Sequence, residues 1–257
     1  MTTQNQFLRL QRIHLPDSAR LAALVDVETT GLSCARDRIV EFAGVLFAFD
    51  PKAGKVLAII DEYATLSDHE VPIPRRTSDV HGIHEGMVKD RHLDPKRIDL
   101  LLADAEFVVA HNAKFDFGFL SLVSAVARSK PWRCSINGVS WASEGHSSAK
   151  LQSLLESYGI YPESAHRVLG DVLRTLELLN RPSSSGQPFL KQLVDSPPDG
   201  FTDMESTPDK QESAKRSSTT HPKSNGFAGF CTCAFCRWVA IPLGGLALLM
   251  LTVSLLG

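Results

Sequence analysis

Two acidic residues, Asp26 and Glu28, lie within the apolar segment LVDVETTGL at residues 24–32. The leucines and valines around them are typical of a β-strand, and residues two apart in a strand point to the same face. The two carboxylates are therefore expected about 7 Å apart. Ionised carboxylates at this separation repel each other, so a divalent ion such as Mg²⁺ or Mn²⁺ would stabilise them. Taken alone, such a pair is more often a strand face exposed to water.

Two further acids lie in segments with the same kind of pattern. Asp116 follows an apolar stretch and the dipeptide His-Asn in AHNAKFDFGFL, and Asp171 follows His166 by five residues in HRVLGDVLRTLELL. Each acid could simply favour the first turn of a helix, and His166 alone could be a surface histidine. Chance rarely combines an Asp-x-Glu strand, an Asp after a strand and a His-x4-Asp helix start in this order. The set therefore indicates a metal-dependent active site.

Alternating strand and helix patterns over residues 20–180 predict an α/β domain that would position these acids. The predicted strands are residues 23–29, 38–50, 55–66, 107–112 and a short one at 133–136, and the predicted helices are 95–106, 115–129, 151–160 and 171–180. A turn at Asp50, Pro51 and Gly54 predicts that the second and third strands are antiparallel. Sites in α/β folds lie at the edge where strands end and helices begin.

The 257 residues carry a formal net charge of −2, which argues against binding of nucleic acid by bulk positive charge. We predict an N-terminal extension at residues 1–19, a catalytic domain at 20–181, a flexible linker rich in Ser, Pro and Thr at 182–237, and a membrane anchor at 238–257. No N-terminal signal peptide is apparent. Cys231, Cys233 and Cys236 are interpreted as juxtamembrane thiols, acylated or plain, in preference to a zinc site with His221.

Residues 238–257 contain no charged side chain and are about as long as a helix that crosses a bilayer. Arg237 and Trp238 stand at the N-terminal border of this stretch, where basic and aromatic residues are common. We therefore expect a transmembrane helix that anchors the C-terminus and leaves the catalytic domain facing the cytoplasm. The alternative is a hydrophobic helix packed on the domain.

The motifs DVETTGL, HNAKFD and HRVLGD resemble those of the DEDDh 3′–5′ exonucleases, a family that includes the proofreading epsilon subunit of bacterial DNA polymerase III. The resemblance covers about residues 20–180, and Val168 departs from it where many relatives have alanine. It implies a ribonuclease-H-like fold, in which helices flank a mixed five-stranded sheet. It also implies that two divalent ions, Mg²⁺ or Mn²⁺, are held by Asp26, Glu28, Asp116 and Asp171, and that His166 is the general base.

The same resemblance implies hydrolysis of nucleic acid from its 3′ end with release of 5′-mononucleotides, with DNA as the favoured substrate. Thr29, Thr30, Gly31 and Leu32 would cradle the terminal nucleotide, although this turn could also be a simple connection. His111 and Asn112 either contact the substrate or support the Asp116 turn, and we favour support. The alternatives are a proofreading or repair subunit that acts only with a polymerase partner, and an RNA 3′-end-trimming exonuclease. A purely binding module would not need four clustered carboxylates.

Overall fold

The first strand, β1 (Arg20–Thr29), is almost entirely buried because it lies in the middle of a five-stranded sheet. The sheet order is β3-β2-β1-β4-β5, with β2 at Ile39–Asp50, β3 at Lys55–Leu66, β4 at Val108–Ala110 and β5 at Trp132–Cys134. The first three strands are antiparallel neighbours, whereas β4 and β5 run parallel to β1. This is the mixed ribonuclease-H-like sheet that the family resemblance implied. The computed structural model describes residues 14–161 and 168–201.

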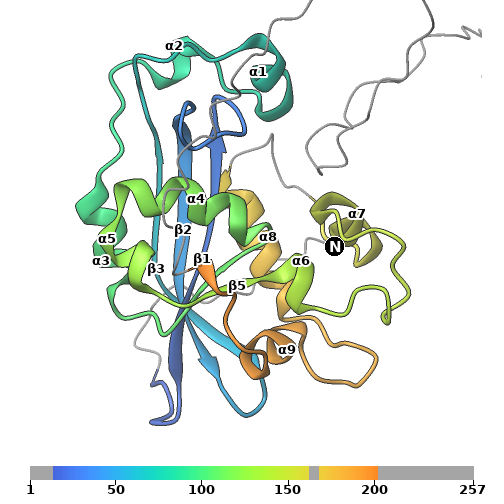
Figure 1. Ribbon diagram of the computed structural model, residues 1–257. Coiled ribbons are helices and arrows are strands. Elements are labelled where there is room, and N and C mark those ends of the chain that lie inside the picture. The colour runs from blue at the N-terminus through green and yellow to red at the C-terminus, as the bar shows by residue number, and fades with distance from the viewer. Residues whose placement is uncertain (1–13, 162–167, 202–257) are drawn as a thin grey trace, which may run out of the picture. The chain divides into compact units, whose positions relative to one another are not determined.

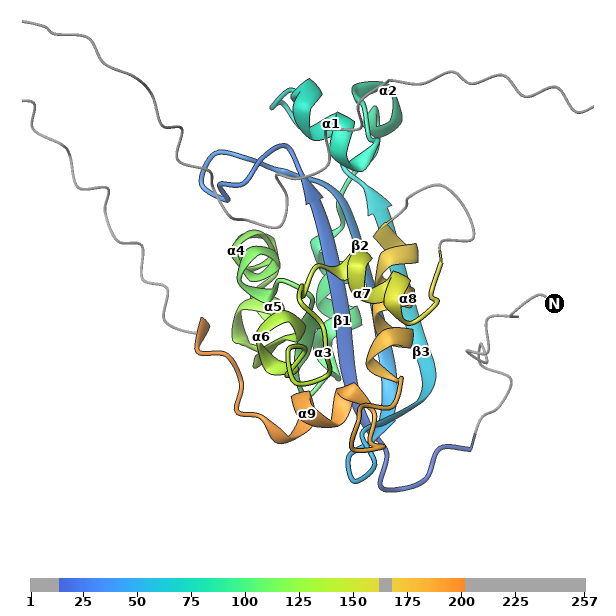
Figure 2. The same ribbon diagram turned by 90° about the vertical axis from the view of Figure 1, so that its right-hand side faces the viewer.

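Helices cover both faces of the sheet (Figures 1 and 2). One face carries α3 (Pro95–Ala103), α4 (Ala113–Val123) and α5 (Ala125–Ser129), and the other carries α7 (Leu151–Ser157) and α8 (Val168–Leu179). The strand alternation divides the core accordingly. Ala22 and Leu24 of β1 pack on the α7–α8 side, and Ala23 and Val25 pack on the α3–α4 side.

The predicted helix at residues 115–129 is two helices, because the chain turns at Ser124. The Ser124 hydroxyl donates to Asp99 Oδ1 at 2.5 Å and accepts the backbone N–H of Ala127 at 2.9 Å. Ser124 therefore caps α5 and fastens this corner to α3. Besides α9 (Phe189–Asp195), which is described below, the short helices that the sequence did not predict are α1 (Arg75–His81), α2 (Glu85–Val88) and α6 (Ser135–Gly138).

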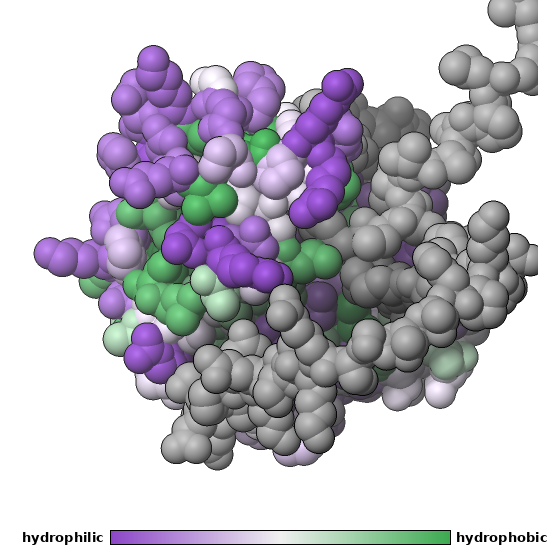
Figure 3. Space-filling model, turned by 45° about the horizontal axis from the view of Figure 1, so that its top comes forward, coloured by the Kyte–Doolittle hydropathy of each residue, from purple (hydrophilic) through white to green (hydrophobic). Residues whose placement is uncertain are grey.

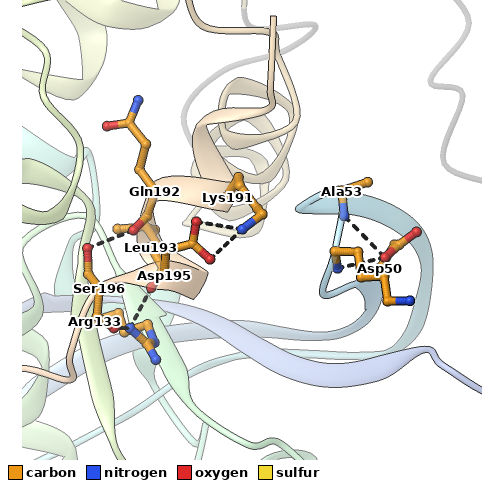
Figure 4. Close-up of polar contacts among 9 residues, drawn as sticks. Asp50, Ala53, Arg133, Lys191, Gln192, Leu193, Asp195 and Ser196 are labelled. Carbon is orange, nitrogen blue, oxygen red and sulfur yellow. Dashed lines mark hydrogen bonds and ion pairs between the residues drawn. The ribbon is translucent and has the colours of Figure 1, made fainter. Parts of the chain in front are cut away.

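The predicted linker does not begin at residue 182, because residues 182–201 pack on the domain. They include α9 (Phe189–Asp195), whose Phe189, Leu190 and Leu193 side chains are at most 1% exposed. Figure 4 shows Arg133 of β5 reaching α9, where its Nη1 donates to the carbonyl oxygens of Leu193 and Ser196. The catalytic domain therefore extends at least to residue 201, and the rest of the predicted linker lies outside the described residues.

The sequence-predicted extension at residues 1–19 is described only from residue 14, and the predicted anchor at 238–257 lies outside the described residues. Within the ranges that are described, no helix is long and apolar enough to span a bilayer.

β3 forms one outer edge of the sheet, and its register with β2 is irregular at two places, between Leu46 and Phe47 and between Ala48 and Phe49. Arg97 of α3 reaches this edge, where its Nη2 lies 2.7 Å from Asp61 Oδ1 and its guanidinium stacks 5.3 Å from the centre of the Tyr63 ring. The other edge strand, β5, is only three residues long. Both edges of the sheet are therefore short or partly covered.

Candidate active site

The C-terminal half of β1 carries Asp26 and Glu28 on one face of the sheet. Asp26 and Glu28 follow Leu24 by two and four residues, so they share its face of the strand. Both carboxylates therefore lie on the side that α7 and α8 cover. β4 pairs with β1 only at Ala23 and Leu24, so these acids lie beyond that pairing, where β1 is paired with β2. The prediction that the pair shares a strand face is confirmed.

Asp116 reaches the same region from the first turn of α4. β4 is parallel to β1, so both strands end at the same edge of the sheet, and α4 begins three residues after β4. The Asp116 side chain is buried, with 2% of its surface exposed, and its carboxylate interacts with the backbone N–H of Val27 in β1.

Asp171 lies in the first turn of α8, which packs on β1 and β2. Its charge raises the pKa of both Asp26 and Glu28, and the charge of Asp116 does the same. Four carboxylates from β1, α4 and α8 thus interact electrostatically, as the ordered motifs predicted.

Burial is the main reason that three of these carboxyl groups resist ionisation. It raises the pKa of Asp26 well above its ordinary value, that of Glu28 to about 8 and that of Asp116 to about 7. Repulsion from neighbouring carboxylates adds to the shifts of Asp26 and Glu28. A cation bound among these groups would reverse the shifts, because it favours the ionised forms.

Two buried carboxylate oxygens are further evidence that this site can bind a cation. Glu28 Oε2 and Asp116 Oδ1 have no hydrogen-bond partner within the described part of the chain. Buried carboxylate oxygens are costly without a donor or a metal. The four acids therefore suit hard divalent ions. In the described ranges, no three His, Cys, Asp or Glu side chains are grouped closely enough to hold an ion as they stand.

His166, the predicted general base, lies outside the described residues. His111 follows β4, and both of its ring nitrogens have a partner. Nε2 donates to the carbonyl oxygen of Ala149 at 2.8 Å, and Nδ1 therefore accepts from the Ser135 hydroxyl at 2.8 Å. Burial lowers the pKa of His111 to about 4, so the ring is neutral at pH 7. The His111 ring thus ties the chain before α4 to the start of α6 and to Ala149, whereas Asn112 is exposed at the start of α4.

The loop after β1 holds its own polar groups together. Thr29 Oγ1 donates to the Gly31 carbonyl at 2.6 Å, and Thr30 Oγ1 accepts the backbone N–H of Arg38 at 3.0 Å. Both threonines are buried, whereas Leu32 is 54% exposed. Of the four residues predicted to cradle a nucleotide, Leu32 is thus the one that offers an open side chain.

Two charged residues near the site were not singled out from the sequence. Glu41 of β2 is 5% exposed and lies directly opposite Glu28 in the β1–β2 ladder, where its charge raises the pKa of Glu28. Arg174 of α8 forms an ion pair with Asp171. The spacing of three residues on a helix could have indicated the second contact, whereas the first depends on strand register.

Comparisons with known proteins agree with this geometry. The family model for exonucleases (RNase_T) matches residues 24–179. The chain is 32% identical over 163 residues to DNA polymerase III PolC-type of Thermotoga petrophila, covering 62% of this chain and 11% of that protein. It is 28% identical over 164 residues to DNA polymerase III subunit epsilon of Treponema pallidum, covering 60% of this chain and 72% of that protein.

The fold resembles solved exonucleases as well. Escherichia coli Exonuclease I in complex with a dA16 oligonucleotide superposes with a TM-score of 0.53 at 16% identity, covering 67% of this chain and 42% of that one. The described domain thus has the fold of an exonuclease, and its match to the family model includes Asp26, Glu28, Asp116 and Asp171. The chain belongs to the exonuclease (RNase_T) family and carries the motifs of its DEDDh 3′–5′ members.

Proposed function

We propose that this protein is a metal-dependent 3′–5′ exonuclease that releases 5′-mononucleotides, with DNA as the favoured substrate. The observation that carries the proposal is the convergence of four carboxylates from β1, α4 and α8, two of which have a buried oxygen with no partner among the described residues. The names of the relatives, DNA polymerase III PolC-type and DNA polymerase III subunit epsilon, support DNA over RNA.

Asp26, Glu28, Asp116 and Asp171 would hold two divalent ions, Mg²⁺ or Mn²⁺. Such ions would neutralise the phosphate and lower the pKa of the attacking water. His166 would accept the proton from that water, for which its ordinary pKa near 6.5 is suited. Leu32 would contact the terminal base through its exposed side chain, and His111 would hold the start of α4 in place.

The test is a digestion assay with the full-length chain and three 3′-labelled substrates: single-stranded DNA, duplex DNA with a mismatched end, and RNA. We expect mononucleotide release from DNA with Mg²⁺ or Mn²⁺ and none with chelator. Asp171→Asn should reduce the rate by about two orders of magnitude or more. Glu177→Gln is the matched control, since Glu177 lies on the same helix in a half-exposed pair with Arg181. Equal rates for wild type and Asp171→Asn would refute the site.

The role of His166 has a separate test. We expect His166→Ala to fold but to turn over about 100-fold more slowly or worse, as after loss of a general base. The wild-type rate should fall as the pH drops through the titration range of the histidine. If the rate does not fall at acid pH, and chemistry is shown to be rate-limiting, His166 would only orient the substrate.

A second candidate is a proofreading or repair subunit that acts with a polymerase. It is supported by the relatives, because the Treponema pallidum protein is a DNA polymerase III subunit. Co-purification of a polymerase with the tagged chain, together with faster removal of mismatched ends in the complex, would favour this role. Full activity of the isolated chain without co-purification would favour an independent nuclease.

We also propose that residues 238–257 anchor the protein in a membrane, with the nuclease domain on the cytoplasmic side. The absence of charge over the length of this stretch supports the proposal. The full-length chain should pellet with membranes and resist carbonate extraction, whereas a chain ending at residue 226 should be soluble and active. Recovery of the full-length chain in the soluble fraction without detergent would overturn the anchor.

A further inference from the structure

Arg174 is a buried arginine at the rim of the carboxylate cluster, where 9% of its surface is exposed. Its Nη2 donates to Asp171 Oδ1, and its Nε lies 3.3 Å from the carbonyl oxygen of Gly170. Its Nη1 is buried and has no hydrogen-bond partner among the described residues. A guanidinium remains protonated in proteins, so a buried one requires an anion. Asp171 supplies that anion.

A second arginine on the same helix provides a contrast. Arg181 pairs with Glu177, and these side chains are 42% and 35% exposed. The corresponding values for Arg174 and Asp171 are 10% and 24%. Exposed pairs contribute little because water screens them, whereas loss of one partner from a buried pair leaves an uncompensated charge. The Arg174–Asp171 pair is therefore the one on α8 that should influence the site.

The charges around the site indicate an electrostatic role for Arg174. Glu41 is a buried carboxylate beside the four predicted metal ligands, since it lies opposite Glu28. Arg174 adds one positive charge to this group of acids and is bonded to the carboxylate of Asp171, one of the predicted metal ligands.

We propose that Arg174 is a positioning residue that competes with the divalent ion for the Asp171 carboxylate and thereby sets the metal concentration at which the site fills. This inference rests on the proposed function, because it assumes that Asp171 is a metal ligand. In the metal-free protein the guanidinium substitutes for the missing cation. When an ion binds, Asp171 must leave the arginine or share its two oxygens between both cations.

The test compares four full-length proteins: wild type, Arg174→Met, Arg174→Lys and the matched control Arg181→Met. Mn²⁺ affinity is measured by calorimetry on metal-free protein at fixed ionic strength, and stability in chelator is measured by urea unfolding. Arg174→Met should bind Mn²⁺ on the order of tenfold more tightly. Loss of a group that contacts a metal ligand usually weakens binding by a factor of this size or more, and here the sign is reversed because the group removed is a competing cation. It should also be less stable in chelator, because Asp171 loses its counter-ion.

Arg174→Lys keeps the charge, so its Mn²⁺ affinity and its stability in chelator should lie between those of wild type and Arg174→Met. Arg181→Met should match wild type in both measurements. If Arg174 acts through Asp171, adding Arg174→Met to Asp171→Asn should leave the remaining Mn²⁺ affinity unchanged. Unchanged or weaker Mn²⁺ binding by Arg174→Met, or by Arg174→Lys if the methionine variant does not fold, would overturn the competition. Failure of the wild type to bind Mn²⁺ at all would instead refute the proposed function.

Discussion

A methyl group on Gly31 would stand 2.5 Å from Oδ2 of Asp37, closer than non-bonded atoms approach. Asp37 cannot simply move away, because the same oxygen accepts the backbone N–H of Ser33 at 2.9 Å and Oδ1 lies 3.3 Å from the Thr30 hydroxyl. Gly31 is therefore required for close packing of the loop that follows β1.

From this contact we predict that Gly31→Ala destabilises the domain by about 1–3 kcal/mol, as overpacking usually does. The double variant Gly31→Ala/Asp37→Ala should lose less than the sum of the single variants, since the clash is gone. Urea unfolding of the four proteins gives this coupling directly. Simple additivity would show that the loop accommodates the methyl group in another way.

Replacement of the buried acid Asp116 should raise stability in chelator and weaken metal binding. At pH 7.5 in chelator, Asp116→Asn should be about 1–3 kcal/mol more stable than wild type, because it removes a charge that burial disfavours. The variant should also lose most of the rise in melting temperature that Mn²⁺ gives the wild type. Thermal melts with and without Mn²⁺ test both effects, and a full Mn²⁺ shift in Asp116→Asn would remove Asp116 from the ligand set.

The neutral state of His111 should make stability depend on pH. Its pKa in the folded protein is about 4, below the ordinary value near 6.5. As the pH falls from 6.5 to 4, the unfolded chain takes up a proton that the folded chain refuses, so stability is lost, by about 3 kcal/mol at the acid end. His111→Gln lacks this loss.

The His111 measurement is the difference between wild type and His111→Gln in urea unfolding at several pH values, which cancels the contributions of the other groups. We expect wild type to be the more stable protein at pH 7.5, because its two hydrogen bonds fit the ring. The gap should narrow steadily towards pH 4. A gap that stays constant would mean that His111 takes up its proton equally in both states.

The segment after α8 should be essential for folding. Phe189, Leu190 and Leu193 are fully buried, and burial of each contributes about 1.5–3 kcal/mol. Their sum is comparable with the whole stability of a domain. We predict that a chain ending at residue 181 is unfolded, whereas one ending at 201 melts cooperatively. Thermal melts of the two truncations, followed by circular dichroism, test this. A cooperative melt of the 1–181 chain would contradict the prediction.

Periodicity predicted the elements whose structure depends on local sequence. The three long strands and α8 agree with it because their apolar residues recur with a strand or helix period. The acids were found because strand alternation and helix starts fix where Asp26, Glu28, Asp116 and Asp171 lie. Each of these inferences needs only a few neighbouring residues.

Other features depend on contacts between distant residues and could not be read in this way. The break between α4 and α5 arises from the bond between Ser124 and Asp99, which are 25 positions apart. α9 was not predicted because Ser and Pro residues surround it, although its four apolar residues are a weak helical signal. Glu41 could be placed opposite Glu28 only once the register of β1 and β2 was known.

The long edge strand β3 has a consequence for self-association. A regular, apolar edge of twelve residues would be a template on which another chain could add a strand and begin an aggregate. The register irregularities beside β3, the charges of Lys55, Asp61 and Glu62 along it, and the Arg97 side chain at its margin all disfavour such pairing. Concentrated solutions of the folded domain should therefore resist edge-to-edge polymerisation, even though the sheet is not closed.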